Sequence, residues 1–232
     1  MGPAVMAAFT SFHAPGFWLV IALLGGVAVA AARPFVLAGW RIVLFAGFWI
    51  GLPYLALIAG GVSPRLMGLL YVDWITSLRL GVGLALALIA VAAVARLSLR
   101  HTGASPSEAG STGAPRWVAP LVIVTLSGAE EFFWCFLRGA VLELMLALQI
   151  SVQLPLYWSI WIAAVFALPL SLAYRTGGYA RLVILAVLVM TSILFFYTRN
   201  FWLCWAVHAA VLLLLDMPEE TAAQVHIATP QR

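Results

Sequence analysis

The chain has 232 residues, of which 65% are hydrophobic and 9% charged, and its formal net charge is +4. Soluble domains average roughly 45–50% apolar and about 25% charged residues. A soluble domain of this length has too little interior to bury so much apolar surface, so the excess must face lipid. The basic residues are all arginine and mostly stand singly near the ends of apolar runs. That placement is typical of membrane anchors and argues against a nucleic-acid partner.

The apolar runs predict transmembrane helices, because each bilayer crossing needs about 20 mainly apolar residues. In chain order the predicted helices cover residues 16–32, 42–61, 80–95, 118–137 (with 150 as an alternative end), 155–174, 182–198 and 201–217. The predicted fold is an all-α, polytopic transmembrane helix bundle of about seven spans, with six and eight as the alternatives.

Loop composition divides the chain. Residues 1–96 form a predicted three-helix membrane part, in which the segment 63–77 (SPRLMGLLYVDWITS) is expected to be a helix lying in the membrane interface. Residues 97–116 form a polar linker rich in Ser, Gly and Pro. Residues 117–217 form a four-helix part, and 218–232 a polar tail. The positive-inside rule predicts a cell-membrane protein whose linker and C-terminus are cytoplasmic.

Ionisable residues inside apolar runs are the first candidates for function, because a charge is costly to bury in a bilayer. Glu130 and Glu131 are adjacent in the fourth run, in SGAEEFFWCFLRG. Adjacent helical residues point about 100° apart, so the two carboxylates are expected to face different neighbours. Alternatively, they cap a re-entrant segment or bond across a helix interface. Arg138 follows Glu131 by two turns, about 10 Å, which predicts a stretched or bridged pair, or an arginine at the headgroups.

His208, in NFWLCWAVHAAVLLLLD, is the only histidine inside a predicted span. It is either a core residue bonded to a neighbour or a functional group. Two i,i+4 pairs accompany it: Glu131 with Cys135, and Cys204 with His208. If the two helix faces meet, Glu131, Cys135, Cys204 and His208 would offer ligands to zinc. The alternative is that both cysteines are small packing residues.

The order of these elements resembles the CAAX-protease and bacteriocin-processing (CPBP) family of intramembrane proteases. The resemblance covers roughly residues 118–216: a Glu-Glu pair with aromatics and Arg-Gly, then a helix at F-x-x-x-H spacing, then H-x-x-x-Asn/Asp. It implies a site in which a glutamate activates water, and histidines with an Asn or Asp stabilise the oxyanion. The remnant catalytic residues would be Glu130, Glu131, His208 and Arg138.

The match to the family motifs is incomplete. In E-E-x-x-x-R the arginine position is Cys135, and Arg138 fills it only if three residues are inserted. Phe166 begins F-x-x-x-H, whose histidine position is Leu170. The last position of H-x-x-x-Asn/Asp, counted from His208, is Leu212. Two leucines in place of a histidine and an asparagine remove hydrogen-bond donors that hydrolysis needs.

Three functions follow from this pattern. The favoured hypothesis is a catalytically degenerate CPBP-like protein that serves as a membrane scaffold or accessory subunit for another membrane protein. The second is an active glutamate-dependent intramembrane endopeptidase. The third is a cofactor-holding subunit of a larger complex, in which His208 ligates a tetrapyrrole metal.

Overall fold

The computed structural model describes residues 3–101, 118–175 and 177–215. Within these residues the regular structure is entirely helical, which confirms the predicted all-α class. The helices are α1 (Pro3–Thr10), α2 (Pro15–Ala32), a 3-10 turn η1 (Arg33–Phe35), α3 (Ala38–Ile58), α4 (Trp74–His101), α5 (Val118–Ala147), α6 (Pro155–Tyr174), α7 (Gly178–Thr198) and α8 (Phe201–Leu214).

Six helices in the described part of the chain, α2 to α7, are long and apolar enough to cross a membrane. Helix α8 is a seventh apolar helix of 14 residues. At 1.5 Å per residue it rises about 21 Å, which is less than the hydrocarbon thickness of about 30 Å. The chain is therefore a multi-pass helical bundle suited to a lipid bilayer, with about seven spans as predicted.

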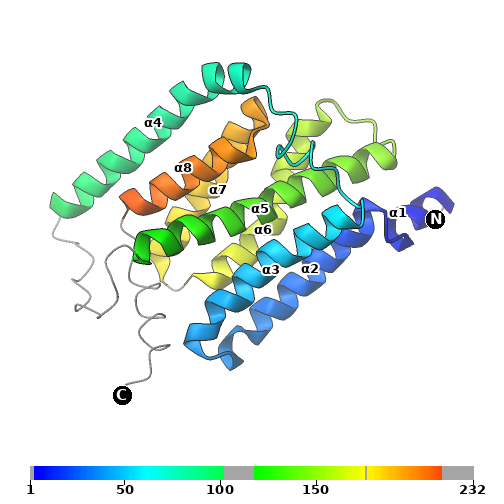
Figure 1. The fold of residues 1–232 in the computed structure, drawn as a ribbon, viewed down its shortest axis with the longest axis horizontal. Coiled ribbons are helices and arrows are strands. Elements are labelled where there is room, and N and C mark those ends of the chain that lie inside the picture. Colours follow the sequence, from blue (N-terminus) through cyan, green and yellow to red (C-terminus); the bar gives the residue numbers. More distant parts are fainter. Residues whose placement is uncertain (1–2, 102–117, 176, 216–232) are drawn as a thin grey trace.

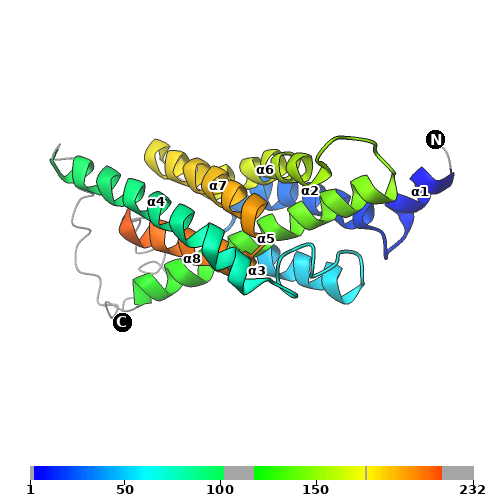
Figure 2. The same cartoon turned by 90° about the horizontal axis from the view of Figure 1, so that it is seen from above.

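Helix α5 lies at the centre of the bundle, where it packs against α2, α3, α6 and α8. Helix α4 lies at one edge, on α7 and α8, and α2 and α3 lie on the opposite side of α5 (Figure 1). Seen from above, α6 and α7 lie on one side of α5 and α3 lies on the other (Figure 2). More of α5 is buried than of any other span, and less of α4. Polar residues on α5 are thus held in the interior.

The helix boundaries agree best where proline and asparagine mark them. Helix α6 coincides with the predicted 155–174 and has Pro155 in its first turn, where its missing N–H is not needed. Helix α8 begins at the predicted residue because the Asn200 side chain accepts a hydrogen bond from the backbone N–H of Leu203 at 3.2 Å. Helix α5 takes the longer of its two predicted forms and ends at Ala147.

Helix α4 differs most from its predicted range of 80–95. It runs from Trp74 to His101 and so enters both the predicted interfacial segment and the predicted linker. The extra residues include leucines and arginines, which have high intrinsic helix propensity. The remainder of the predicted linker and the predicted tail at 218–232 lie outside the described residues.

The predicted interfacial helix at 63–77 is wrong. Residues 59–73 form a series of turns, and only 74–77 are helical, as the first turn of α4. Gly60, Gly68 and Tyr71 have positive φ angles of 69°, 72° and 56°. A left-handed residue ends helical geometry, and two of these residues, Gly68 and Tyr71, lie within 63–77 and prevent a continuous helix there.

The 59–73 connection is bonded to the ends of two helices. The backbone N–H of Ser63 donates to Glu143 Oε1 on α5 at 3.0 Å. The carbonyl oxygen of Gly68 accepts from the backbone N–H of Phe201, at the start of α8, at 3.1 Å. Met67 between them is fully buried. The connection therefore fixes α5 and α8 relative to each other at this end of the bundle.

Asp73 stabilises the start of α4. Its Oδ1 accepts from the backbone N–H of Thr76 at 3.1 Å, and its Oδ2 accepts from the Thr76 hydroxyl at 2.6 Å. These hydrogen bonds favour the charged carboxylate and lower the pKa of Asp73 below its ordinary value. The side chain acts as a helix cap outside the membrane span.

Candidate functional site

Glu131 and Arg138 form a direct ion pair in the centre of α5. The distance from Arg138 Nη1 to Glu131 Oε1 is 2.8 Å, and both side chains are buried. Cys135 lies between them on the same face, where its thiol donates to Glu131 Oε1 at 3.8 Å and accepts from Arg138 Nη1 at 3.5 Å. The expected stretched pair is wrong, because the long arginine side chain extends back along the helix over two turns and reaches the carboxylate directly, and the Cys135 thiol also bridges the two groups.

Arg138 also binds α7. Its Nη2 donates to the hydroxyl groups of Thr191 at 3.3 Å and Ser192 at 3.2 Å. The guanidinium carbon lies 5.0 Å from the centroid of the Phe195 ring, within range of a cation–π contact. Arg138 is only 2% exposed, so the alternative that it anchors at the headgroups is also wrong.

Glu130 has a different arginine partner, Arg175. The Arg175 Nη2 atom lies 2.8 Å from Glu130 Oε2. Arg175 directly follows α6 and has an extended backbone, and its guanidinium carbon lies 4.7 Å from the centroid of the Tyr174 ring. In the sequence, Arg175 looks like the other arginines at the ends of apolar runs, a placement typical of membrane anchors. Only the packing of α6 on α5 reveals its role.

His208 lies between the two glutamates. Its Nδ1 is 3.3 Å from Glu131 Oε2, and its Nε2 is 3.8 Å from Glu130 Oε2. The expectation that the adjacent glutamates face different neighbours is correct for the arginines, because each glutamate has its own arginine partner. It is wrong for His208, which both glutamates approach. An imidazole presents nitrogens at separate positions on the ring, and each approaches one carboxylate.

An aromatic stack holds the His208 ring in place. The Trp134 and His208 rings are nearly parallel, at 12°, with centroids 4.9 Å apart. The indole Nε1 of Trp134 in turn donates to the Ser171 hydroxyl of α6 at 3.2 Å. The imidazole orientation thus depends on side chains from α5 and α6 as well as on the two carboxylates.

The cluster as a whole is buried and balanced in charge. Glu130, Glu131 and His208 have zero exposure, and Arg175 is 8% exposed. Two glutamates and two arginines cancel in formal charge, so the cluster carries no net charge when the imidazole is neutral. Pairing of this kind lowers the cost of placing four charges in a bilayer.

The two ion pairs differ in how completely they are satisfied. Among the described residues, three buried atoms around Glu130 have no hydrogen-bond partner: Glu130 Oε1, Arg175 Nε and His208 Nε2. No atom of Glu131 or Arg138 is in this condition. The Glu131–Arg138 pair is thus closed by protein groups, whereas the Glu130–Arg175 pair retains hydrogen-bonding capacity.

The four proposed zinc ligands lie near one another, but their geometry differs from that of a metal site. In the described part of the chain no group of three or more His, Cys, Asp or Glu side chains is arranged to hold a metal ion. The guanidinium of Arg138 contacts both Glu131 and Cys135 and supplies positive charge there. The Cys204 thiol donates to the carbonyl oxygen of Thr191 at 3.6 Å. These contacts favour packing and hydrogen-bonding roles for both thiols.

The predicted site residues Glu130, Glu131, Arg138 and His208 come together in this cluster. The two positions at which the resemblance implies a histidine and an Asn or Asp hold apolar side chains. Leu170 on α6 and Leu212 on α8 are both buried, with exposures of 5% and 4%. Comparisons of the chain with family models, with curated proteins and with solved structures give no match. The residues of the cluster and their geometry are therefore the basis for the functional argument.

Proposed function

We propose that this multi-pass membrane protein is a non-catalytic relative of the CPBP intramembrane proteases, acting as a membrane scaffold or accessory subunit. The observation that supports this best is the closed state of the Glu131 carboxylate. Its Oε1 accepts hydrogen bonds from Arg138 and Cys135, and its Oε2 is bonded to His208. A general base for water needs an available oxygen, and hydrolysis needs donors aimed at the oxyanion.

The cluster suits a structural role in such a scaffold. Arg138 joins α5 to α7, Arg175 joins α6 to α5, and His208 joins α8 to α5. The side chains thus connect four helices, α5 to α8. Lipid tails offer these polar groups no hydrogen bonds in place of those contacts. Buried polar contacts of this kind can fix which helices pack together.

The partner of the scaffold would be another helical membrane protein. Large aromatic side chains are enriched at protein interfaces because they bury much area with little loss of conformational freedom. Several tryptophans are partly exposed on the outside of the bundle, namely Trp74, Trp158 and Trp202. They offer contact area to a neighbouring protein at the depth of the headgroups.

The test removes the groups that catalysis would need and keeps the net charge of the cluster unchanged. Glu131→Gln with Arg138→Met removes the carboxylate and its cation together. If the protein is a scaffold, this double variant should still restore the wild-type phenotype to a strain that lacks the gene. It should also still co-purify with the partner in native mass spectrometry. Loss of function in a folded double variant, or a wild-type protein that is always a bare monomer, would contradict the proposal.

A second candidate function is supported by the three unpartnered atoms around Glu130. A carboxylate oxygen, an imidazole nitrogen and a guanidinium N–H offer acceptor and donor groups to a water molecule. In a glutamate-dependent intramembrane endopeptidase, Glu130 would act as the base, and Glu131 would position His208. Glu130→Gln would then cause unprocessed membrane-protein substrates to accumulate in cells. Unchanged processing in that variant would exclude this candidate.

The geometry does not favour a tetrapyrrole-holding role for His208. Both of its nitrogens lie within 3.8 Å of carboxylates, and one ring face is stacked on Trp134. A metal ligand needs one nitrogen directed at an open coordination position. An absorption spectrum of the purified protein tests this, and a co-purified chromophore would revive the hypothesis.

We infer further that the protein lies in the cell membrane with the α2–α3 and α6–α7 connections on the cytoplasmic side. Arg33, Arg41 and Arg181 lie at this end of the bundle, and the positive-inside rule favours it for the cytoplasm. Labelling of an added cysteine at Ser11, at the other end of α2, should succeed from outside intact cells. Labelling only after permeabilisation would reverse the orientation.

A further inference from the structure

The connection between α2 and α3 combines exposed apolar side chains with two arginines. Phe35, Leu37 and Trp40 are 89%, 74% and 63% exposed, and Arg33 and Arg41 flank them. The predicted membrane spans of these two helices end at Phe35 and begin at Trp40. The connection therefore lies at the membrane boundary, where aromatic side chains favour the headgroup layer.

Backbone carbonyl groups hold both arginines in position. Arg33 Nη2 donates to the carbonyl oxygen of Tyr174 at 3.5 Å, and Arg41 Nε donates to that of Val36 at 3.1 Å. Neither bond involves an acidic side chain. A guanidinium carries five N–H donors, so each arginine retains donors for a second acceptor. Both side chains are partly exposed.

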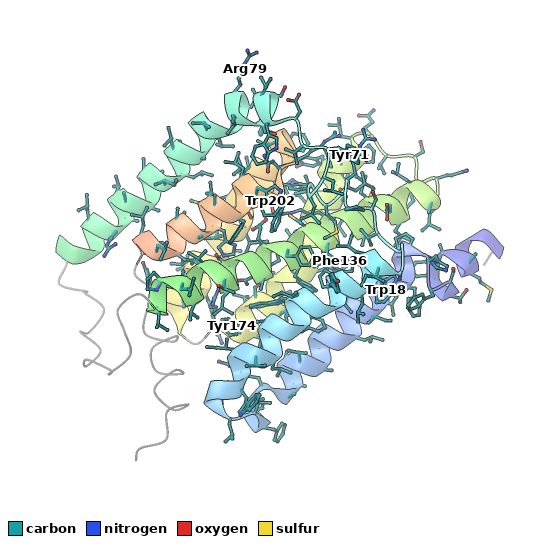
Figure 3. All side chains as sticks on the ribbon, viewed as in Figure 1. Trp18, Tyr71, Arg79, Phe136, Tyr174 and Trp202 are labelled. Atoms are coloured by element: carbon teal, nitrogen blue, oxygen red, sulfur yellow. The ribbon has the colours of Figure 1, made fainter. Side chains whose placement is uncertain are left out.

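In the described part of the chain, the hydrogen bonds of Arg33 and Arg41 go to backbone carbonyl groups and not to acidic side chains. The first acidic residue in the sequence is Asp73, and it precedes α4 at the opposite end of the bundle, where Figure 3 shows the nearby Arg79, away from Tyr174. Glu130 is already paired with Arg175. Phosphate groups of lipids lie at the depth of the connection and match the fork geometry of guanidinium groups.

We propose that the α2–α3 connection is a binding site for an anionic phospholipid, whose phosphate is held by Arg33 and Arg41 while its acyl chains contact Phe35, Leu37 and Trp40. Charge and apolar exposure together favour a lipid over a soluble anion. The exposed apolar side chains gain from burial in the acyl region, which a free phosphate ion cannot provide.

The site also contacts the buried cluster through one helix end. The Arg33 donor binds the carbonyl oxygen of Tyr174, and the next residue, Arg175, is the partner of Glu130. A lipid bound at Arg33 therefore lies close to Arg175, whose guanidinium pairs with Glu130 in the cluster. This proposal concerns lipid binding and does not depend on whether the cluster is catalytic.

Native mass spectrometry of the full chain in detergent tests the proposal with phosphatidylglycerol, phosphatidylcholine and inorganic phosphate as probes. The wild type should bind phosphatidylglycerol more tightly than phosphatidylcholine. Each arginine near an anionic surface is worth about fivefold in affinity, so Arg41→Gln should weaken phosphatidylglycerol binding about fivefold. Arg33→Gln with Arg41→Gln should weaken it about 25-fold.

Two further variants serve as controls. Arg65→Gln with Arg79→Gln removes two exposed arginines from the opposite end of the bundle and should leave binding unchanged. Arg33→Lys with Arg41→Lys keeps the charge and should retain more binding than the glutamine pair, which separates lost charge from lost folding. Equal binding of the two lipids by the wild type, equal losses in the two glutamine pairs, or displacement of the lipid by inorganic phosphate would overturn the proposal.

Discussion

Breaking the Glu131–Arg138 pair from one side should destabilise the protein far more than removing both partners. Arg138→Met removes three charge-assisted hydrogen bonds, one to the Glu131 carboxylate and two to hydroxyl groups, and leaves that carboxylate buried without its cation. Removing one member of a buried ion pair costs roughly 3–5 kcal/mol. Glu131→Gln should cost a similar free energy of unfolding, because it leaves the guanidinium unpaired.

The pair can be followed by thermal unfolding in detergent, using the fluorescence of the ten tryptophans. For a protein of this size about 1 kcal/mol corresponds to roughly 2–4 °C in Tm, so each single variant should lose about 6–20 °C. Glu131→Gln with Arg138→Met leaves no unpaired charge and should fall within about 2 kcal/mol of the wild type.

The matched control is Arg79→Met, which removes an exposed arginine and should change stability by no more than about 0.5 kcal/mol. The reasoning fails if the double variant is as unstable as the sum of the two single variants, because the pair would then have no coupling energy. A single variant with the Tm of the wild type would refute it as well.

Two further predictions concern the 59–73 connection and α4. Gly68→Ala should destabilise the protein by more than about 1 kcal/mol, because φ is +72° and a Cβ would lie 2.5 Å from the carbonyl oxygen of Arg199. Gly83→Ala, whose Cβ would meet nothing within 4 Å, should not destabilise the protein. The Tm values of the two variants test this difference. Stabilisation of the first turn of α4 by Asp73 should be present at neutral pH and should fade as the pH falls below about 4, because the folded-state pKa is lowered. Protection of the Thr76 amide from hydrogen exchange measures this stabilisation. In Asp73→Asn the stabilisation should be independent of pH in this range. Equal pH responses in wild type and variant would contradict the assignment.

The buried cluster shows how a bilayer protein can retain ionisable residues that a soluble core would rarely hold. Each charge in it has an oppositely charged neighbour on the same or an adjacent helix. The balance is needed because lipid offers neither water nor counterions to an unpaired group. The residues that complete the balance, Arg138 and Arg175, are as necessary to the arrangement as the glutamates.

The sequence by itself determined the membrane class, the helical fold and most helix positions, because hydropathy depends on composition over about 20 residues and needs no knowledge of packing. It also identified Glu130, Glu131, Arg138 and His208, since ionisable side chains in apolar runs are conspicuous. The ends of α4 were less well predicted, because helix continuation beyond the membrane depends on local propensity rather than on hydropathy.

Only the tertiary structure decided how these residues meet. Sequence spacing gives the face of one helix, so the Glu131–Cys135–Arg138 face could be predicted from periodicity. The partner of Glu130 could not, because Arg175 is 45 residues away and reaches α5 only through the packing of α6. In the same way, the placement of His208 between two carboxylates depends on how α8 lies on α5, since contacts between helices are set by side-chain packing over the whole interface.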